Sequence, residues 1–338
     1  MAGTKPVRVA AVGVGGWGRV LAEAAAKNTG LTLVACTSRS AEHRDAFAKA
    51  YGCRPLPSLD AVLADAGVEG VLISTTHAVH AEQIVAAAGA GKHVFVEKPF
   101  TLTVTDAQRA TEACRRARVT LAVGHQRRKS PASRALKRLL DEGALGRVAQ
   151  IEGNFSGTLG FTFKPGIWRA DRAETPGGAM TNIGIHHVDT YQYLLGPIAR
   201  VSAFSRRVAL TGVEIDDTTS ILFEFASGSL GYLGTSWVHA NRTATITLHG
   251  TEAHAWSEAD GTRLFLAGRG EAERRELSLA PADPVVEELA EFARCVRDGS
   301  RPEVSGEEGT ANVAVLEAIV ESAATGRAVA VKSAVASR

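Results

Sequence analysis

The first 125 residues alternate short apolar runs with longer segments of helical periodicity. The apolar runs have the length of strands buried on both faces, and they are Val7–Val12, Leu31–Cys36, Val71–Ser74, His93–Val96 and Thr120–Val123. The segments with helical spacing are Gly18–Asn28, Ala41–Tyr51, His80–Ala88 and Val104–Ala117. Continuous apolar strands that alternate with helices are typical of βαβ units. We therefore predict a doubly wound parallel sheet for residues 1–125.

The pattern changes after residue 125, where polar and apolar positions alternate with a period of two. Such runs predict strands with one face open to solvent or covered by a partner. They are Ala149–Gly157, Val201–Arg207, Thr218–Phe225, Gly231–His239, Thr243–His249 and the short Ala328–Val331. Helical segments are Ser133–Glu142, Ile185–Leu195, Val285–Asp298 and Glu307–Thr325. We predict an α/β protein whose residues 126–338 form an α+β domain with a large, mostly antiparallel sheet. The last helix is a candidate to pack back on the first domain.

Composition excludes several classes of protein. The 38 Lys+Arg against 36 Asp+Glu give a net charge of +2, without the clustered basic excess that nucleic-acid binding requires. No apolar stretch approaches the roughly 18–20 residues that span a bilayer. The cysteines have no metal-like or redox-like spacing, and they are Cys36, Cys53, Cys114 and Cys295. We therefore expect a cytoplasmic protein that binds neither nucleic acid nor membrane, with reduced thiols and no metal.

A glycine motif stands directly after the first predicted strand. The segment from Gly13 to Gly18, with Gly15 and Gly16 between them, fits G-x-G-x-x-G and opens a predicted helix. Glycines there allow a tight turn and a close backbone approach to a pyrophosphate, which the free N–H groups of the helix bind. Residues 1–125 are therefore predicted to be a Rossmann dinucleotide-binding domain, and Trp17 within the turn is assigned to the same site.

The end of the second strand bears on the choice of dinucleotide. An acidic residue about 20 positions after the glycines normally binds the ribose hydroxyls of NAD. Here that position is Ser38, followed by Arg39, and the next carboxylate is Glu42. A hydroxyl and a guanidinium suit the 2′-phosphate of NADP. NADP is favoured, and NAD remains the alternative if Arg39 is only a solvated loop residue.

Lys98 follows the fourth predicted strand, in the segment Glu97-Lys98-Pro99. Ligands of open parallel sheets bind beyond the carboxyl ends of the strands, which places Lys98 at such a crevice. A lysine shielded from water beside a nicotinamide has a lowered pKa and is suited to exchange a proton with a substrate hydroxyl. The alternative is a surface lysine at a turn.

A second cluster of polar residues follows a pair of glycines at 177 and 178. On an α-helix, Asn182 and His186 are four residues apart and Asp189 is three further on, so the three share one face. His186 is suited to orient a substrate hydroxyl or to act as an acid or base. A lone histidine on an amphipathic helix is more often structural, and this alternative remains open.

Together these segments resemble the glucose-fructose oxidoreductase/inositol dehydrogenase family, Gfo/Idh/MocA. The resemblance covers nearly the whole chain. It is carried by the glycine motif, Glu97-Lys98-Pro99, the segment 124–128, the Gly184-x-His186-x-x-Asp189 element and the closing segment 317–329.

The resemblance implies an enzyme that oxidises or reduces a sugar, cyclitol or related polyol with a nicotinamide cofactor. Lys98 matches the family's catalytic lysine and His186 its catalytic histidine. Further residues are assigned to the site: Thr75, His80 and Glu97 to the cofactor, and Lys98, Arg128, Trp168, Asn182 and His186 to the substrate. The resemblance also implies a homodimer or homotetramer formed through the C-terminal sheet.

Two positions depart from the family's pattern. Asn182 stands where many members have aspartate, and an amide cannot act as a base, so its role reduces to hydrogen bonding. The loop after the third strand reads Thr75-Thr76-His77 rather than Thr-Pro-Asn, which makes His77 a candidate for specificity.

Other interpretations remain. An enzyme that oxidises, eliminates and re-reduces would cleave glycosides without net use of cofactor, and a nucleotide-bound sensor would have no turnover. A zinc site from His77, His80 and His125 is disfavoured because no cysteine or carboxylate is obviously placed with them. Three tryptophans either stack on a sugar or pack internally, and they are Trp17, Trp168 and Trp237.

Overall fold

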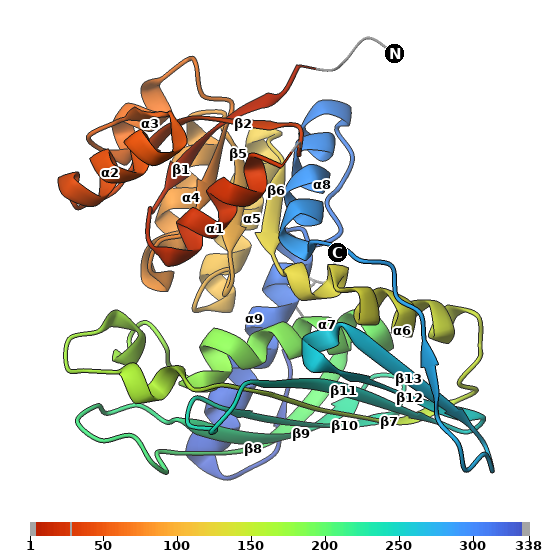
Figure 1. Ribbon diagram of the computed structural model, residues 1–338. Helices are drawn as coiled ribbons and strands as arrows, with labels where there is room; N and C mark the ends of the chain where they lie inside the picture. Colours follow the sequence, from red (N-terminus) through yellow and green to blue (C-terminus); the bar gives the residue numbers. More distant parts are fainter. Residues whose placement is uncertain (1–4, 28, 333–338) are drawn as a thin grey trace. The chain divides into compact units, whose positions relative to one another are not determined.

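The computed structural model describes residues 5–27 and 29–332, and the chain divides into two compact units. The first unit comprises residues up to 126 together with 283–310. The second comprises residues 127–282 and the chain from 311 onward. Figure 1 shows the elements of both units.

Within the described residues, the first unit contains a six-stranded sheet in the order β3-β2-β1-β4-β5-β6, with every neighbouring pair parallel. Its strands are β1 (Val7–Val12), β2 (Leu31–Thr37), β3 (Arg54–Pro55), β4 (Gly70–Ile73), β5 (His93–Glu97) and β6 (Leu121–Gly124). The predicted doubly wound sheet is confirmed. The sequence pattern missed β3, because two exposed residues leave no apolar run to detect.

The helices of the first unit begin with side-chain caps where the sequence offers a hydroxyl. Ser40, Ser58 and Thr103 each accept a hydrogen bond from a backbone N–H of the first turn that follows. The helices are α1 (Gly16–Ala25), α2 (Ala41–Tyr51), α3 (Leu59–Ala64), α4 (His80–Gly89), α5 (Val104–Ala117) and α8 (Pro284–Asp298). Helix α3 was not predicted. The predicted end of the first helix at Asn28 lies outside the described residues.

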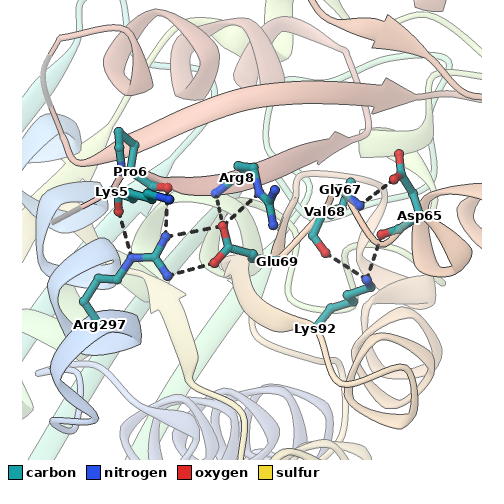
Figure 2. A network of polar contacts seen from close by, with 9 residues as sticks. All are labelled: Lys5, Pro6, Arg8, Asp65, Gly67, Val68, Glu69, Lys92 and Arg297. Atoms are coloured by element: carbon teal, nitrogen blue, oxygen red, sulfur yellow. Dashed lines mark hydrogen bonds and ion pairs between the residues drawn. The ribbon is translucent and has the colours of Figure 1, made fainter.

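Helix α8 differs from the expectation that everything after residue 125 forms the second domain. Its residues Leu289 and Phe292 are fully buried in one apolar cluster with Val7 and Leu31 of the parallel sheet. Near its end, Arg297 donates to Glu69 and to the backbone carbonyls of residues 5 and 6 (Figure 2). The sequence shows that this helix is amphipathic but not which sheet its apolar face covers.

Within the described residues, the second unit contains a nine-stranded sheet in the order β14-β13-β12-β11-β7-β10-β9-β8-β15. Strands β7 and β10 pair in parallel, and the other neighbours are antiparallel. The strands are β7 (Val148–Ser156), β8 (Ile198–Arg206), β9 (Thr218–Phe225), β10 (Leu230–Ser236), β11 (Thr243–Gly250), β12 (Ala253–Glu258), β13 (Arg263–Gly268), β14 (Arg275–Leu277) and β15 (Val329–Ala330). The predicted mostly antiparallel sheet is confirmed, although the last three strands before α8 were not predicted.

Three helices cover one face of this sheet (Figure 1): α6 (Pro131–Asp141), α7 (Ile185–Leu195) and the part of α9 (Gly306–Thr325) that belongs to the second unit. Leu136, Val188 and Leu316 from these helices share one buried cluster with Ile151 and Leu233 of the sheet. The opposite face carries exposed apolar side chains, among them Phe204, Leu222, Leu230 and Tyr232. None of the helices in the described residues is long and apolar enough to cross a membrane.

Candidate active site

The glycine turn between β1 and α1 is sterically closed to side chains at two positions. Gly13 has a φ of +92°, and a Cβ on it would lie 2.8 Å from the carbonyl oxygen of Ser74. A Cβ on Gly18 would lie 2.3 Å from the carbonyl oxygen of Gly13. The Ser74 hydroxyl donates to that same carbonyl at 2.9 Å. These two glycines therefore shape the turn itself.

The other two glycines face open space. A Cβ on Gly15 or Gly16 would have no atom of the described residues within 4 Å. Helix α1 begins at Gly16, and no side chain of the described part caps its first N–H groups. Open space in front of an uncapped helix N-terminus fits a pyrophosphate. The residues present therefore fit a dinucleotide.

The end of β2 lies beside this turn, because the backbone N–H of Gly13 donates to the carbonyl of Thr37 at 3.1 Å. Ser38 and the exposed Arg39 follow. Ser40 caps α2, and Glu42 lies in the first turn of that helix. A hydroxyl and a guanidinium therefore directly follow the end of β2.

Glu97 is buried at the end of β5, with its side chain turned into the unit. Its Oε2 accepts the backbone N–H of Lys98 at 3.3 Å, and a Cβ on Gly124 would lie 2.7 Å from its Oε1. Burial raises the pKa of the carboxyl to about 7, although the Lys98 charge and the Trp17 indole N–H oppose the rise. Glycine at 124 thus leaves room for a carboxyl that titrates near neutral pH, directly before Lys98.

His80, predicted to lie near the cofactor, contacts the segment that follows Lys98. Its Nδ1 is 3.0 Å from the carbonyl oxygen of Pro99. His77 is also buried, in a short 3₁₀ turn, and the two rings are 5.9 Å apart. Thr75 donates to the side chain of Gln83 at 2.7 Å. In the described residues, no group of three or more His, Cys, Asp or Glu side chains is arranged to hold a metal ion.

In the second unit, the segment Met180–Gly184 is a π-helix, and α7 begins at Ile185. The α-helical spacing assumed between Asn182 and His186 is therefore wrong, because a π-turn closes over five residues instead of four. The spacing between His186 and Asp189 lies within α7 and holds. Both Asn182 and His186 are buried.

Glycines with close neighbours stand before this π-helix and at its end. Gly178 has a φ of +55°, and a Cβ on it would lie 1.9 Å from the carbonyl oxygen of Asp216. The N–H of Gly177 donates to the Thr181 hydroxyl at 2.8 Å. A Cβ on Gly184 would lie 2.6 Å from the sulfur of Met180. The paired glycines seen in the sequence therefore allow the close backbone packing of the segment that leads to His186.

The ring of Phe155, in β7, packs against two histidines at the start of α7. Its ring centroid is 5.8 Å from that of His186 and 5.2 Å from that of His187. The guanidinium of Arg127 lies 4.6 Å from the Phe155 centroid and pairs with Asp260 at 2.6 Å. The environment of His186 is therefore aromatic, with a cation nearby.

Arg128 and Asp189 form a buried, two-pronged ion pair. Nε and Nη2 of Arg128 donate to the two carboxylate oxygens of Asp189 at 2.7 and 2.8 Å. The amide of Asn312 also donates to Asp189, at 2.7 Å. Arg128 was predicted to bind substrate, and the structure shows its guanidinium engaged with α7. Asn312 carried no local signal because it is 123 positions away from Asp189 in the sequence.

The segment before the π-helix contains Trp168 and Arg169. The Arg169 guanidinium lies 4.2 Å from the Trp168 ring centroid. Burial lowers the pKa of Arg169. Trp237, in contrast, is fully buried, with its ring 4.9 Å from that of Phe163. Trp237 is therefore a core residue, whereas Trp168 stays a candidate for ligand stacking.

Two family models together match most of the chain. Residues 7–125 match an oxidoreductase family with an NAD-binding Rossmann fold, and residues 133–255 match the Gfo/Idh/MocA C-terminal domain. The chain belongs to the Gfo/Idh/MocA oxidoreductases. The resemblance seen in the sequence is thereby confirmed, and the fit of the glycine turn to a dinucleotide agrees with this family's NAD-binding fold.

Known oxidoreductases resemble this chain along most of its length. A 1,5-anhydro-D-fructose reductase from Ensifer adhaerens is 30% identical, over 91% of this chain and 94% of its own length. An inositol 2-dehydrogenase from Rhizobium meliloti is 26% identical, over 96% of this chain and 99% of its own length. Among solved structures, a protein assigned as an NADPH-dependent oxidoreductase from Desulfitobacterium hafniense has a TM-score of 0.91 at 34% identity, covering 97% of this chain and 99% of its own.

Proposed function

We propose that this protein is an NADP-dependent dehydrogenase or reductase that acts on a secondary hydroxyl or ketone of a sugar, cyclitol or related polyol. The observation that carries the proposal lies in the first unit. Lys98 follows β5 at the carboxyl edge of the parallel sheet, the same edge at which the uncapped N-terminus of α1 follows β1. A proton-exchanging side chain and a pyrophosphate cradle on one sheet edge suit nicotinamide chemistry.

In this proposal, the glycine turn and the α1 N-terminus hold the cofactor pyrophosphate, and Thr75 and Trp17 border the same site. When bound, the nicotinamide supplies hydride exchange. Lys98 moves the proton at the substrate hydroxyl oxygen. The buried Glu97, which directly precedes it in the chain, accepts the Lys98 backbone N–H and provides a nearby charge that changes near neutral pH.

His186 is proposed to orient the same hydroxyl. It lies at the start of α7, where Phe155 and the π-helix restrict its position. Asn182 hydrogen-bonds the substrate without taking a proton, and Trp168 offers a stacking face. Arg128 acts on the substrate pose chiefly through its ion pair with Asp189. Accurate positioning of this kind supplies much of the rate in reactions whose difficult step belongs to the cofactor.

The preference for NADP rests on Ser38 and Arg39 at the end of β2. Relatives include an NADP⁺-dependent D-xylose 1-dehydrogenase from Haloarcula marismortui and an NAD⁺-dependent scyllo-inositol 2-dehydrogenase from Bacillus subtilis. Both cofactors thus occur among similar proteins, so the preference needs its own measurement. Arg39→Ala is expected to raise the KM for NADP⁺ about tenfold or more and to leave that for NAD⁺ nearly unchanged.

The decisive assay follows absorbance at 340 nm with NADP⁺ and NAD⁺ over a panel of free sugars, inositols, glycosides and sugar acids. Lys98→Ala is expected to lower kcat by about 10²–10⁴-fold. Lys49→Ala, at an exposed position on α2, is the matched control and should match the wild type. A wild-type rate that survives in Lys98→Ala would remove this lysine from the chemistry.

A flat trace with every substrate would redirect the proposal. The same mixtures would then be analysed for cleaved glycosides, whose appearance would indicate an enzyme that oxidises, eliminates and re-reduces. Fluorescence titration with NADPH that shows binding without any product would indicate a sensor.

We also propose that a second copy of the chain covers the open face of the large sheet. The exposed apolar side chains there include Leu222, 60% exposed, and Phe204, 68% exposed. Leu222 lies opposite Tyr232 on the neighbouring strand, and contiguous exposed apolar surface of this kind commonly marks interfaces. Light scattering should show a dimer or tetramer, and Leu222→Asp should shift the oligomeric state toward the monomer.

A further inference from the structure

A small pocket lies in the second unit behind the first turn of α7. Its volume is about 20 Å³, enough for one water molecule, which requires about 10–15 Å³. The residues that line it come from the 3₁₀ turn before α6, α6, α7, β11, β12 and the turn after β12: Arg127, Ser130, Ala132, Ser133, Leu136, His187, Thr190, Ala244, Ile246, Ser257 and Gly261.

His187 presents an unused hydrogen-bond acceptor at this pocket. Its Nε2 donates to the carbonyl oxygen of Thr245 at 3.1 Å, so the proton of the ring is on that nitrogen. Burial, together with the charge of Arg127, lowers its pKa to about 3, which keeps the ring neutral. Its Nδ1 therefore carries a lone pair, and this atom is buried without a hydrogen-bond partner among the described residues. His187 as a whole is 3% exposed.

Ser133 presents an unused donor at the same pocket. Ser130 Oγ donates its proton to Ser133 Oγ at 2.8 Å and accepts the backbone N–H of Ser133 at 3.3 Å. The hydroxyl proton of Ser133 has no acceptor among the described residues. A buried donor without an acceptor costs about 1–3 kcal/mol, as does a buried acceptor without a donor. The pocket therefore lacks a group that accepts once and donates once.

We propose that this pocket is a hydration site for one water molecule, which accepts the Ser133 hydroxyl and donates to Nδ1 of His187. An anion does not suit the site, since it would face the lone pair of Nδ1. A cation does not suit it either, because the Arg127 guanidinium borders the space. Arg127 is itself engaged by Asp260 at 2.6 Å, which leaves the water to the serine and the histidine.

The hydration site gives His187 a second anchor. One ring nitrogen is held by β11 and the other, through the water, by α6. His187 directly follows His186 and directly precedes Val188, which is fully buried in the core. The π-helix before α7 lacks the regular α-helical ladder, so the side chain of His187 fixes the backbone where that ladder begins. His187 is thus a positioning residue for His186, a consequence that rests on the proposed function.

A crystal structure of the whole protein at about 1.5 Å resolution tests the site directly. The expected result is a water peak about 2.7–3.2 Å from both Ser133 Oγ and His187 Nδ1. Absence of a peak would overturn the proposal. Data from a crystal soaked in bromide would overturn it as well if an anomalous peak appeared in the pocket, since the occupant would then be an anion.

Variants test the same link in solution. Ser133→Ala and His187→Phe should each lower Tm by about 2–4 °C. The decrease in Tm of the double variant should be clearly smaller than the sum of the two single decreases, because both single changes remove the same bridge. Full additivity would contradict a shared water. His187→Gln, which keeps one donor and one acceptor, should recover most of the Tm, and Ser227→Ala on an exposed turn is the control.

The positioning role has a separate readout. With any substrate found in the panel, His187→Phe should lower kcat at least tenfold and leave the KM for NADP⁺ unchanged, and His187→Gln should restore kcat. An unchanged kcat per folded enzyme would overturn the positioning role. If the wild type itself shows no turnover, the proposed function fails, whereas the crystallographic water stands or falls independently.

Discussion

The guanidinium of Arg128 and the carboxylate of Asp189 meet in two parallel hydrogen bonds of 2.7 and 2.8 Å, with side chains 7% and 0% exposed. Asn312 of α9 donates to the same carboxylate and accepts from Gln192 of α7. Residues far apart in the sequence are thereby fixed to the helix that carries His186. The pair is almost completely removed from solvent, so its energetics differ from those of the exposed ion pairs on the surface.

Removing the charge of Asp189 should be costly. Asp189→Asn removes the carboxylate that binds the buried Arg128 cation in a bidentate pair, and is expected to lower the free energy of unfolding by about 3–5 kcal/mol. Urea denaturation followed by fluorescence measures this loss. Asp45→Asn, which breaks an exposed pair with Arg44, is the control and should change stability by less than about 1 kcal/mol. A similar small loss for Asp189→Asn would show that Arg128 finds other compensation.

The raised pKa of Glu97 predicts a pH-dependent stability. Burial raises the pKa of the folded carboxyl to about 7, against 4.5 for a freely solvated glutamate, so the unfolded chain loses this proton first. Stability is unaffected below pH 4.5, falls as the pH rises from 4.5 to 7, and stays lower above. Glu97→Gln should therefore match the wild type at pH 4 and exceed it by up to about 3 kcal/mol at pH 8. Urea denaturation at both values measures the difference.

The exposed Glu273→Gln is the control for this experiment and should alter stability equally at both pH values. A Glu97→Gln difference that does not depend on pH would mean that the pKa of this carboxyl is the same in the folded and the unfolded chain. Because the amide cannot change its charge, the variant should also flatten any kcat profile between pH 6 and 8.

The glycine turn predicts two different outcomes for the same substitution. Gly18→Ala would place a Cβ 2.3 Å from a backbone carbonyl, so we expect loss of folded protein or a Tm lower by at least 5 °C. Gly15→Ala meets no atom of the described residues within 4 Å, so we expect a normal Tm. The methyl group nevertheless fills the pyrophosphate cradle, and NADPH affinity should fall at least tenfold by fluorescence titration. Unchanged affinity in Gly15→Ala would move the cofactor away from this turn.

The Glu69 network predicts an acid-dependent loss of stability (Figure 2). Arg297 is the main cause that lowers the pKa of Glu69 to about 2, with Arg8 donating to the same carboxylate. Its contribution is complete above pH 4.5 and declines as the pH falls toward 2. Glu69→Gln should lower the free energy of unfolding by about 1 kcal/mol at pH 7, a value discounted for solvent exposure. Near pH 2 the substitution should not change the free energy of unfolding. A constant cost at both pH values would exclude an electrostatic origin.

Local pattern was sufficient where an element's own residues determine it. Val7–Val12, Ala41–Tyr51 and Thr218–Phe225 have the predicted bounds, because apolar runs, a serine cap and strict alternation define their ends. Strand β14 escaped prediction because its residues are largely exposed, and α3 because it is short. The π-helix escaped because its cause is contact at Gly178 and Gly184 with distant or preceding residues.

The sequence by itself determined the two sheet classes, the glycine turn, Lys98 at a strand end and His186 on a helix, since each depends on residues close together in the chain. Only the tertiary structure decided which core receives α8, that Glu97 is buried against Gly124, and that Asp189 is shared by Arg128 and Asn312. The physical reason is that burial and hydrogen bonding depend on neighbours in space. A carboxylate far along the chain has no local pattern that reveals whether it will face water or a guanidinium.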